Sequence, residues 1–477
     1  MAIVSDERVL TQLRRYNQWW SGSHKPAPTF HRVAFRRCYD LLTREDWDRA
    51  VLLSGPRRVG KSTILHQVAH RLIRDGHDPR SVLYATLDDN ILKLAGIEGA
   101  IRAFQENVWP SGKPAFLLLD EVHYAHGWDT ALKTLIDHSP ELRILATGSA
   151  ALETGEALSH SGVGRWTTVP IPTLSFYEFL HLVDQPPAGV PSRLRPSECG
   201  SLSKPDLLQI QSAMEPTLPL FREYLLVGGF PETAKRRSDI GEAQRLLRED
   251  VVDRVLKRDI TALFGVRNVS ILEKLFLYVC LNSGLMLNIQ KCAKEIGTSR
   301  TTIDNHLQVL VQANLLYKLE PSLGSGKQVL RPQNKYYLVD AALRNAILLS
   351  GTEILDDPRE AGVIVETAIL RHLMAFYYRD TPRLTYWRGQ NDAEVDIVVR
   401  GPRYAIGTEV KYRERIRPED LAGAAEFEVV EQPDKLFIIT KNQQDFGLRP
   451  VGEGGRPVAW IPAHIFTYLI GQAEREQ

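Results

Sequence analysis

The feature that most constrains this fold is a glycine-rich loop between an apolar strand and an amphipathic helix. Residues 51–54 are predicted to be a buried strand, and residues 61–73 a helix. In this context backbone N–H groups and the positive end of the helix bind phosphate oxygens. We expect Lys61 to neutralise β/γ-phosphate charge and Ser62 to bind Mg²⁺. The loop fits GxxxxGK[ST], and its nucleotide-binding residues are Gly55, Pro56, Arg57, Arg58, Val59, Gly60, Lys61, Ser62 and Thr63.

Two acids follow the apolar strand at residues 116–119. Asp120 is predicted to bind Mg²⁺, and Glu121 to act as a general base or to position the attacking water. An apolar strand that ends in acids is common, but a phosphate loop sixty residues upstream favours the functional interpretation. A second acid favours hydrolysis over nucleotide binding alone.

The next strand, residues 143–146, leads to further candidate nucleotide contacts. Thr147 and Ser149 are predicted to sense the γ-phosphate or to hold the water, and a simple turn is the alternative. Arg165, on a loop beyond, is predicted to reach phosphate in the same subunit or from a neighbouring one. An ordinary surface arginine is the alternative there.

Strands alternate with helices through this half of the chain. Residues 51–54, 81–87, 115–119 and 143–146 are predicted strands, and this alternation predicts a parallel α/β sheet. With 477 residues, of which 43% are hydrophobic, we expect two to four globular domains.

The charge balance and the cysteines exclude several classes. Lys and Arg number 59 against 58 Asp and Glu, which excludes an overall basic coat for nucleic acid. The four cysteines form no CxxC pair, which argues against a disulfide framework and a cysteine zinc site. Without a signal-peptide pattern or a long apolar run, we expect a cytoplasmic protein with no membrane partner.

These motifs come in the order of a known family. The phosphate loop, LLLDEVH, TGSAAL, Gly164-Arg165, residues 172–180 and VGGFPE at 227–232 resemble the prokaryotic AAA-type P-loop ATPases with an uncharacterised C-terminal domain, relatives of the archaeal ATPases and signalling NTPases. The resemblance covers nearly the whole chain and implies ATP as cofactor, with Mg²⁺. A proline-rich insertion at 186–219 departs from it, and Glu178 and Glu232 match the pattern without an evident chemical role.

A helical unit with a winged-helix pattern is predicted at 268–340. Ser299 is a natural N-cap for its third helix, and residues 315–319 and 336–339 are strand-like. DNA contact and protein packing are nearly balanced interpretations. The side chains predicted to face DNA bases are Arg300, Thr301, Thr302, Asn305, His306 and Gln308, and those predicted to contact phosphates are Lys327 and Arg331.

Near the C-terminus, Asp396 and Glu409-x-Lys411 fit a D…ExK arrangement on two adjacent strands. Two carboxylates there could hold Mg²⁺, Lys411 could activate water, and Glu366 from a helix could add a third metal ligand. A hairpin with one solvated charged face is an equal alternative. The family's uncharacterised domain, however, resembles PD-(D/E)xK nucleases, which implies these catalytic roles and Mg²⁺ or Mn²⁺ as metal.

The predicted fold is a P-loop parallel sheet with flanking helices, followed by an α-helical winged-helix unit and then by a small PD-(D/E)xK-like α/β domain. We expect an ATPase that couples nucleotide state to DNA binding and metal-dependent cleavage, in a homo-oligomer or alone. Alternatives are a nucleotide-operated switch that binds DNA or protein without cutting, and a transcription regulator. The predicted boundaries are a lead-in at 1–35, the ATPase domain at 36–185, the insertion or linker at 186–219, a helical lid or connector at 220–267, the winged helix at 268–340 and the nuclease-like domain at 341–477.

Overall fold

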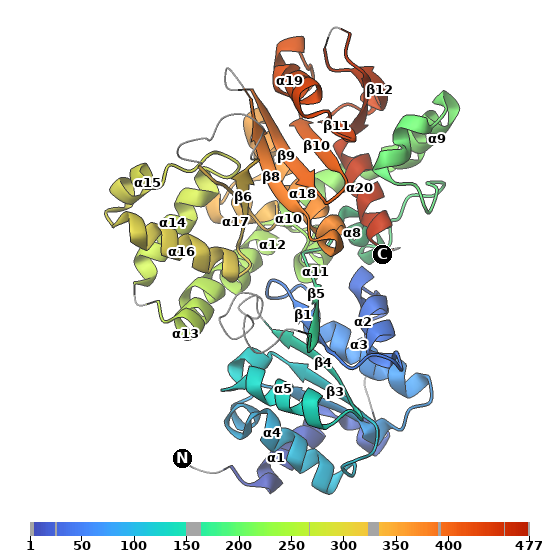
Figure 1. Cartoon of the computed structure of the whole chain (residues 1–477), viewed down its shortest axis with the longest axis vertical. Coiled ribbons are helices and arrows are strands. Elements are labelled where there is room, and N and C mark those ends of the chain that lie inside the picture. Colours follow the sequence, from blue (N-terminus) through green and yellow to red (C-terminus); the bar gives the residue numbers. More distant parts are fainter. Residues whose placement is uncertain are drawn as a thin grey trace. The chain divides into compact units, whose positions relative to one another are not determined.

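The computed structural model describes residues 4–23, 26–148, 164–266, 268–322, 333–389, 393–452 and 454–475. The chain forms two compact units (Figure 1). Unit 1 comprises residues 1–171 and 312–314, and unit 2 comprises residues 172–311 and 315–477. Within these described ranges, no helix is both long and apolar enough to cross a bilayer.

Unit 1 is built on an all-parallel sheet with strand order β2-β3-β4-β1-β5. Four strands lie where the sequence predicts them, since each is an apolar run buried between helices. The predicted P-loop α/β fold is therefore confirmed, whereas β5 was not predicted. The strands are β1 (Ala50–Ser54), β2 (Val82–Thr86), β3 (Ala115–Asp120), β4 (Leu142–Gly148) and β5 (Trp166–Pro170).

Helices cover both faces of this sheet (Figure 1). One face packs against α1 (Asp6–Tyr16), α4 (Asn90–Asn107) and α5 (Trp128–His138) in a single apolar core. The other face packs against α2 (Val33–Thr43) and α3 (Lys61–Arg74). The aromatic lead-in belongs to this unit, because Trp19 and Trp20 both donate their indole N–H to the carbonyl of Val82.

Unit 2 contains an eight-stranded sheet of order β12-β13-β11-β10-β9-β8-β6-β7. Helix α19 (Ala422–Glu431) packs on one part of it, and α18 (Pro358–Tyr377) and α20 (Ala463–Glu474) also contact its strands. The strands are β6 (Leu316–Pro321), β7 (Lys335–Leu338), β8 (Arg383–Arg388), β9 (Glu394–Arg400), β10 (Ala405–Lys411), β11 (Lys435–Thr440), β12 (Gly447–Pro450) and β13 (Pro457–Pro462).

The helices and hairpin of the predicted winged helix occur in unit 2 at the expected positions. Ser299 caps α16 (Arg300–Gln312), as predicted, by accepting from the Thr302 N–H. The hairpin β6–β7 is joined to the C-terminal sheet, because β6 also pairs with β8 at Glu320↔Thr385 and Pro321↔Tyr386. The two regions that the sequence analysis separates at residue 340 thus share one sheet.

Short helices make up the rest of unit 2. They are α8 (Phe176–Leu182), α9 (Lys204–Met214), α10 (Leu218–Val227), α11 (Pro231–Lys235), α12 (Ile240–Leu246), π-helical turns at Leu247–Asp253 and Val255–Asp259, α13 (Ile260–Phe264), α14 (Val269–Leu281), α15 (Ile289–Ile296) and α17 (Ala342–Leu348).

The proline-rich insertion carries helix α9, which the interpretation as a linker does not foresee. Ser203 and Asp206 form a capping box at its start, and Pro205 lies in its first turn, where the absence of an N–H costs little. Ile210 and Met214 of the helix are buried. A high proline content here marks a helix start as well as a loop.

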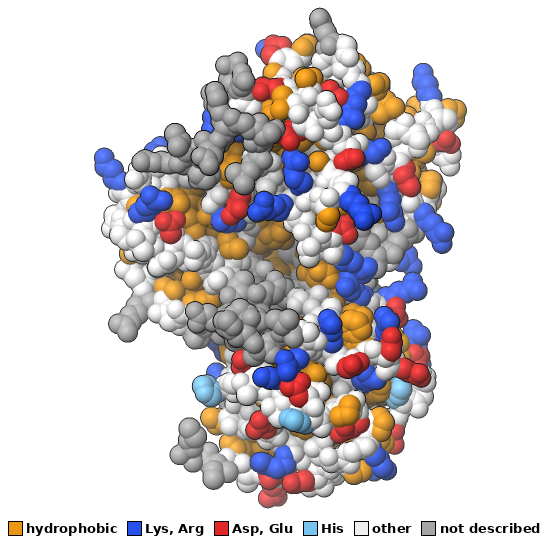
Figure 2. Space-filling model, viewed as in Figure 1, with side chains coloured by type: hydrophobic (Ala, Val, Ile, Leu, Met, Phe, Trp, Pro, Cys, Tyr) orange, Lys and Arg blue, Asp and Glu red, His pale blue; other side chains and the backbone are white. Residues whose placement is uncertain are grey.

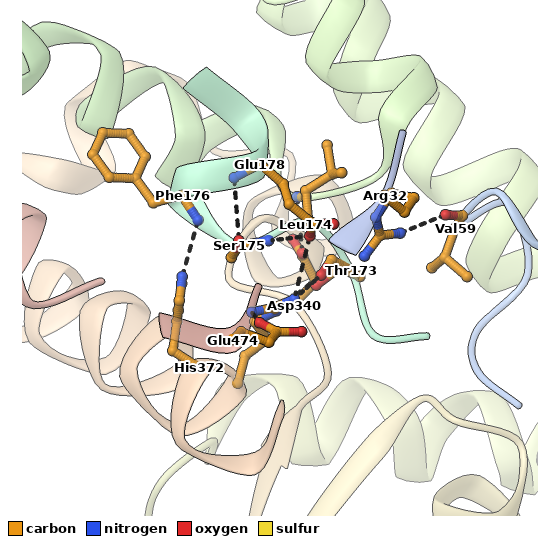
Figure 3. Close-up of polar contacts among 12 residues, drawn as sticks. Arg32, Val59, Thr173, Leu174, Ser175, Phe176, Glu178, Asp340, His372 and Glu474 are labelled. Carbon is orange, nitrogen blue, oxygen red and sulfur yellow. Dashed lines mark hydrogen bonds and ion pairs between the residues drawn. The ribbon is translucent and has the colours of Figure 1, made fainter. Parts of the chain in front are cut away.

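A buried polar cluster in unit 2 explains Glu178 (Figure 3). Ser175 and Glu178 form a reciprocal capping box at the start of α8, each accepting the other's backbone N–H at 3.1 Å. The buried Arg371 donates to the Thr173 carbonyl at 2.9 Å, and its guanidinium lies 3.9 Å from Glu178 and 3.6 Å from Glu474. Glu178 is therefore a structural residue.

His372 holds the same helix start from α18. Its Nε2 accepts from the Phe176 N–H at 2.9 Å, and its Nδ1 donates to the Ala368 carbonyl at 2.6 Å. Burial, followed by the charge of Arg371, lowers the pKa of His372 well below its usual value. The ring is thus neutral, in a tautomer fixed by its two partners.

The VGGF motif packs against a buried aspartate. Asp340 accepts from the N–H groups of Gly229 (2.9 Å) and Ala342 (3.0 Å), while burial raises the pKa of its carboxyl. A Cβ at Gly228 would lie 2.3 Å from Asp340 Oδ1, and one at Gly229 would lie 2.6 Å from the Leu174 carbonyl oxygen. The two glycines therefore permit close backbone packing.

Replacing Gly228 with alanine is expected to lower the free energy of unfolding by about 2–4 kcal/mol. The new Cβ collides with Asp340, and the backbone φ of +78° disfavours a side chain. Gly362→Ala is the matched control, since nothing lies within 4 Å of its Cβ position on α18, and it should cost nothing. Denaturant titrations that give both variants the same midpoint would contradict this account.

Candidate functional site

The phosphate loop in unit 1 has the backbone conformation that its glycines predict. Gly60 has a φ of +101° and directly precedes α3. A Cβ at Gly55 would lie 2.1 Å from the Ile171 carbonyl oxygen, so only glycine fits. Arg32 supports the loop by donating to the Val59 carbonyl at 2.6 Å (Figure 3).

Lys61, predicted to bind phosphate, is the first residue of α3 and is buried. Its Nζ donates to the carbonyls of Gly55 and Pro56, both at 2.9 Å. The ammonium therefore lies against the loop that it is predicted to serve, beside the positive end of the helix.

The carboxylate of Asp120 lies at the carboxyl end of β3 and is oriented by two hydroxyls. Thr147 donates to Oδ1, and Tyr84 donates to Oδ2 at 2.9 Å. Because β4 lies between β1 and β3, Thr147 is placed between the phosphate-loop strand and Asp120. Tyr84 is a residue that the sequence analysis missed, since nothing in β2 distinguishes it from a core aromatic.

Thr147 orients Glu121 as well. Its fully buried Oγ1 accepts from the Glu121 N–H at 2.9 Å, where the Glu121 backbone is left-handed with a φ of +53°. This hydroxyl thus connects both acids, and direct contact with the γ-phosphate stays a prediction. Ser149 lies outside the described residues.

Arg165 makes a two-pronged ion pair with Asp137 of α5. The distances are 2.9 Å from Nε to Oδ1 and 3.0 Å from Nη2 to Oδ2, and both side chains are about one-third exposed. This contact accounts for the present position of the guanidinium, and a role on phosphate stays a prediction.

The donor chemistry of this site fits a magnesium nucleotide. Ser62 supplies a hydroxyl at the start of α3, and Asp120 supplies a buried carboxylate at the end of β3. Hydroxyl and carboxylate oxygens are ligands that Mg²⁺ prefers, and the loop's N–H groups and Lys61 suit phosphate.

A second candidate site lies in unit 2, where β9 and β10 part. Their ladder pairs Ile397–Arg400 with Ala405–Thr408 and ends there. Beyond it, the Asp396 carboxylate accepts from the Val410 N–H (2.8 Å), and the Glu409 carboxylate accepts from the Asp396 N–H (3.3 Å). Lys411 donates to Glu409. The predicted trio Asp396, Glu409 and Lys411 is therefore together.

The alternative of a solvated charged face does not hold for Glu409, which is only 3% exposed, whereas Asp396 and Lys411 are half-buried. Burial, and next the charge of Asp396, raises the pKa of Glu409 to about 8. The same two causes raise the pKa of Glu366 to about 8. Both groups thus favour the protonated form in the protein more than in water.

Strand β7 adds a lysine that the sequence analysis missed. Lys335 is 3% exposed, forms an ion pair with Glu394 and lies with its Nζ 5.0 Å from the ring centre of Tyr386. Tyr337 of the same strand donates to Glu366 at 2.5 Å. The hairpin thereby brings one cation and one donor to the carboxylates of α18 and β9, which sequence spacing could not reveal.

A three-carboxylate metal set that includes Glu366 is not formed in this structure. Among the residues that the structure describes, no group of three or more His, Cys, Asp or Glu side chains could hold a metal ion. Asp396 and Glu409 alone still fit Mg²⁺, which binds proteins through one or two carboxylates and retains water.

The predicted DNA-facing helix α16 presents most of its candidate side chains to solvent. Arg300, Thr301, Asn305 and Gln308 are exposed, Thr302 and His306 are partly buried, and Arg300 lies 3.5 Å from Asp304. Lys327 and Arg331 lie outside the described residues. Figure 2 shows basic and acidic side chains intermixed on the visible face, consistent with the net charge of +1.

Three family models match this chain. Residues 48–180 match an AAA domain, residues 218–353 match a domain of unknown function (DUF8612), and residues 361–453 match another (DUF4143). The first contains the phosphate loop and Glu121, and the third contains Asp396, Glu409 and Lys411.

Relatives match over most of the chain. An uncharacterized protein of Haemophilus influenzae is 26% identical over 310 residues, 64% of this chain and 70% of its own length. One of Methanocaldococcus jannaschii is 26% identical over 385 residues, 76% and 73% of the two chains.

Among solved structures, the Aeropyrum pernix ORC1 protein in complex with DNA has a TM-score of 0.32 at 13% identity, covering 72% of this chain and 97% of that one. AMPPCP-bound DnaA from Aquifex aeolicus has a TM-score of 0.25 at 16% identity, covering 60% and 90%.

Lys335→Met is expected to lower the free energy of unfolding by roughly 3 kcal/mol, because it leaves buried carboxylates without their cation. Lys318→Met is the matched control on the same hairpin. Its ion pair with Glu320 is exposed, and its loss should cost less than about 1 kcal/mol. Thermal denaturation of both variants distinguishes them, and equal shifts would mean that Lys335 is not needed by the cluster.

Proposed function

We propose that this AAA-type P-loop ATPase hydrolyses ATP at the phosphate loop of unit 1 and couples its nucleotide state to DNA binding by unit 2. The observation that carries the proposal is the arrangement around Thr147. One buried hydroxyl contacts the Asp120 carboxylate and the Glu121 backbone at the sheet edge that bears the phosphate loop. Such an arrangement suits a metal ligand and a base that must act on one nucleotide.

Different residues of this site bind the phosphates, hold the metal and act on the attacking water. The loop N–H groups and Lys61 bind the phosphates, while Ser62 and Asp120 would hold Mg²⁺, which neutralises developing phosphate charge when bound. Thr147 and Tyr84 keep the Asp120 carboxylate in one orientation. Glu121 then accepts a proton from water or orients it for attack.

The surface that supports DNA binding lies on α16. This helix exposes Arg300 together with hydrogen-bonding side chains, the kind of surface that contacts bases and phosphates. Packing against another protein is the alternative use of this surface, and it predicts no salt-dependent DNA affinity.

Lys61→Ala is expected to weaken ATP binding, because the phosphate charge loses its cation. Glu121→Gln should retain binding but lower turnover by about 10²-fold or more. Phosphate release and titration with a fluorescent ATP analogue measure the two effects, with Lys113→Ala, an exposed lysine of unit 1, as control. Unchanged turnover in Glu121→Gln would exclude that residue from the mechanism.

Reversing the charges of Arg300, Lys327 and Arg331 together should weaken DNA binding and flatten its salt dependence, since each phosphate contact releases counterions. A matched triple reversal of Arg36, Arg102 and Lys113, exposed in unit 1, makes the same change in net charge. Titrations at several salt concentrations, with and without ATP, compare them. An equal salt slope for both triple variants would assign α16 to protein packing.

Metal-dependent DNA cleavage at Asp396, Glu409 and Lys411 is a second candidate function. The observation in its favour is the meeting of these three side chains where β9 and β10 part. Lys411 would position or activate water, and the two carboxylates would hold Mg²⁺ or Mn²⁺. The opposing interpretation is a nucleotide-operated switch whose unit 2 binds DNA or protein without cutting.

Wild-type protein is expected to cut DNA with Mg²⁺ or Mn²⁺, and Lys411→Ala to lose that activity. Single- and double-stranded DNA are incubated with each metal, with and without ATP, and the products are resolved on gels. Lys441→Ala is the control, since this nearby lysine pairs with the exposed Glu414. Cleavage that persists in Lys411→Ala points to a contaminant, and no cleavage under any condition favours the switch.

A further inference from the structure

A chain of side-chain contacts in unit 1 runs from the phosphate loop to Glu121. Arg57 of the loop donates from Nη1 to the Tyr124 hydroxyl at 3.4 Å. The Tyr124 ring lies against the His123 ring, with centroids 4.3 Å apart. His123 Nδ1 in turn lies 3.3 Å from Glu121 Oε2.

His123 contacts this carboxylate as a neutral ring. Its side chain is 5% exposed, and burial lowers its pKa to about 3, with the charges of Lys61, Arg57 and Lys93 acting in the same direction. A neutral imidazole meets a carboxylate by donating an N–H, so Nδ1 carries the proton. The 3.3 Å separation places this N–H beside Oε2, where it can restrain the carboxylate.

Glu121 thus has contacts at its backbone and at its carboxylate. Its backbone N–H is bound by Thr147, and its left-handed φ of +53° sets the direction in which the side chain leaves β3. These backbone contacts set where the side chain begins, and the His123 contact acts on the carboxylate itself.

We propose that His123 is a positioning residue for Glu121, and that Tyr124 and Arg57 connect this contact to the phosphate loop. A phosphate that attracts the Arg57 guanidinium would alter its contact with Tyr124, and through the packed rings the hold of His123 on Glu121. Occupancy of the loop is thereby coupled to the orientation of the base. This inference rests on the proposed ATP hydrolysis for its catalytic consequence.

The test compares His123→Ala with His123→Asn in the full chain. The alanine variant is expected to lower kcat about 10- to 100-fold with the affinity for an ATP analogue unchanged, because a misplaced base acts poorly. Asparagine, whose side-chain N–H can replace Nδ1–H, should restore kcat to within about fivefold. In a Glu121→Gln background, His123→Ala should have no further effect. His126→Ala, an exposed histidine three residues away, is the control and should behave as wild type.

Turnover equal to wild type in His123→Ala would overturn the proposal, and so would equal losses in the alanine and asparagine variants, which would indicate packing alone. A second readout does not depend on hydrolysis. Nitrogen NMR of the histidine rings should show His123 in the Nδ1–H tautomer, changed by Glu121→Ala and by addition of an ATP analogue. An Nε2–H tautomer would overturn the inference even in active protein. A protein that lacks ATPase activity yet shows the expected tautomer and nucleotide response would overturn only the proposed function.

Discussion

A carboxylate removed from water must find donors, and this requirement fixes the meeting points of distant segments in both units. In unit 1, Asp120 is satisfied by hydroxyls from β4 and β2. In unit 2, Asp340 is satisfied by backbone N–H groups of the VGGF motif and α17. Each buried acid thus selects one arrangement of its neighbours, since any other leaves a charge unpaired.

The two candidate sites apply this rule differently. Asp120 is served by neutral hydroxyls, which orient a negative charge without cancelling it and leave it suited to a cation. The carboxylates near β9 and β10 are served by Lys335 and Lys411 as well as by N–H groups, so their charge is largely balanced within the protein. A cation at the first site would meet a carboxylate held by hydroxyls, whereas a cation at the second would compete with Lys411 for Glu409.

The parts of the fold that are encoded locally could be predicted. The phosphate loop, α3, four strands of the first sheet and the strands that bear Asp396, Glu409 and Lys411 follow from short apolar runs and their boundaries. Helix α20 is buried on all sides, so its sequence has no amphipathic stripe to recognise. Strands β5 and β13 form because they pair with strands that are distant in sequence, and their own residues do not predict this. Tyr84, Lys335 and the role of His123 were missed for the same reason, because their partners are set by the fold.

The pairing of β6 with β8 has a consequence for how this chain can be divided, experimentally or in evolution. The family matches at residues 218–353 and 361–453 suggest two exchangeable modules, yet their strands belong to one sheet. Cutting between them would bare the backbone of β8 at Thr385 and Tyr386 and leave Glu394 without its lysine. An uncovered sheet edge is a template for aggregation. The two matched regions therefore depend on each other for a covered sheet edge and for the ion pair between Lys335 and Glu394.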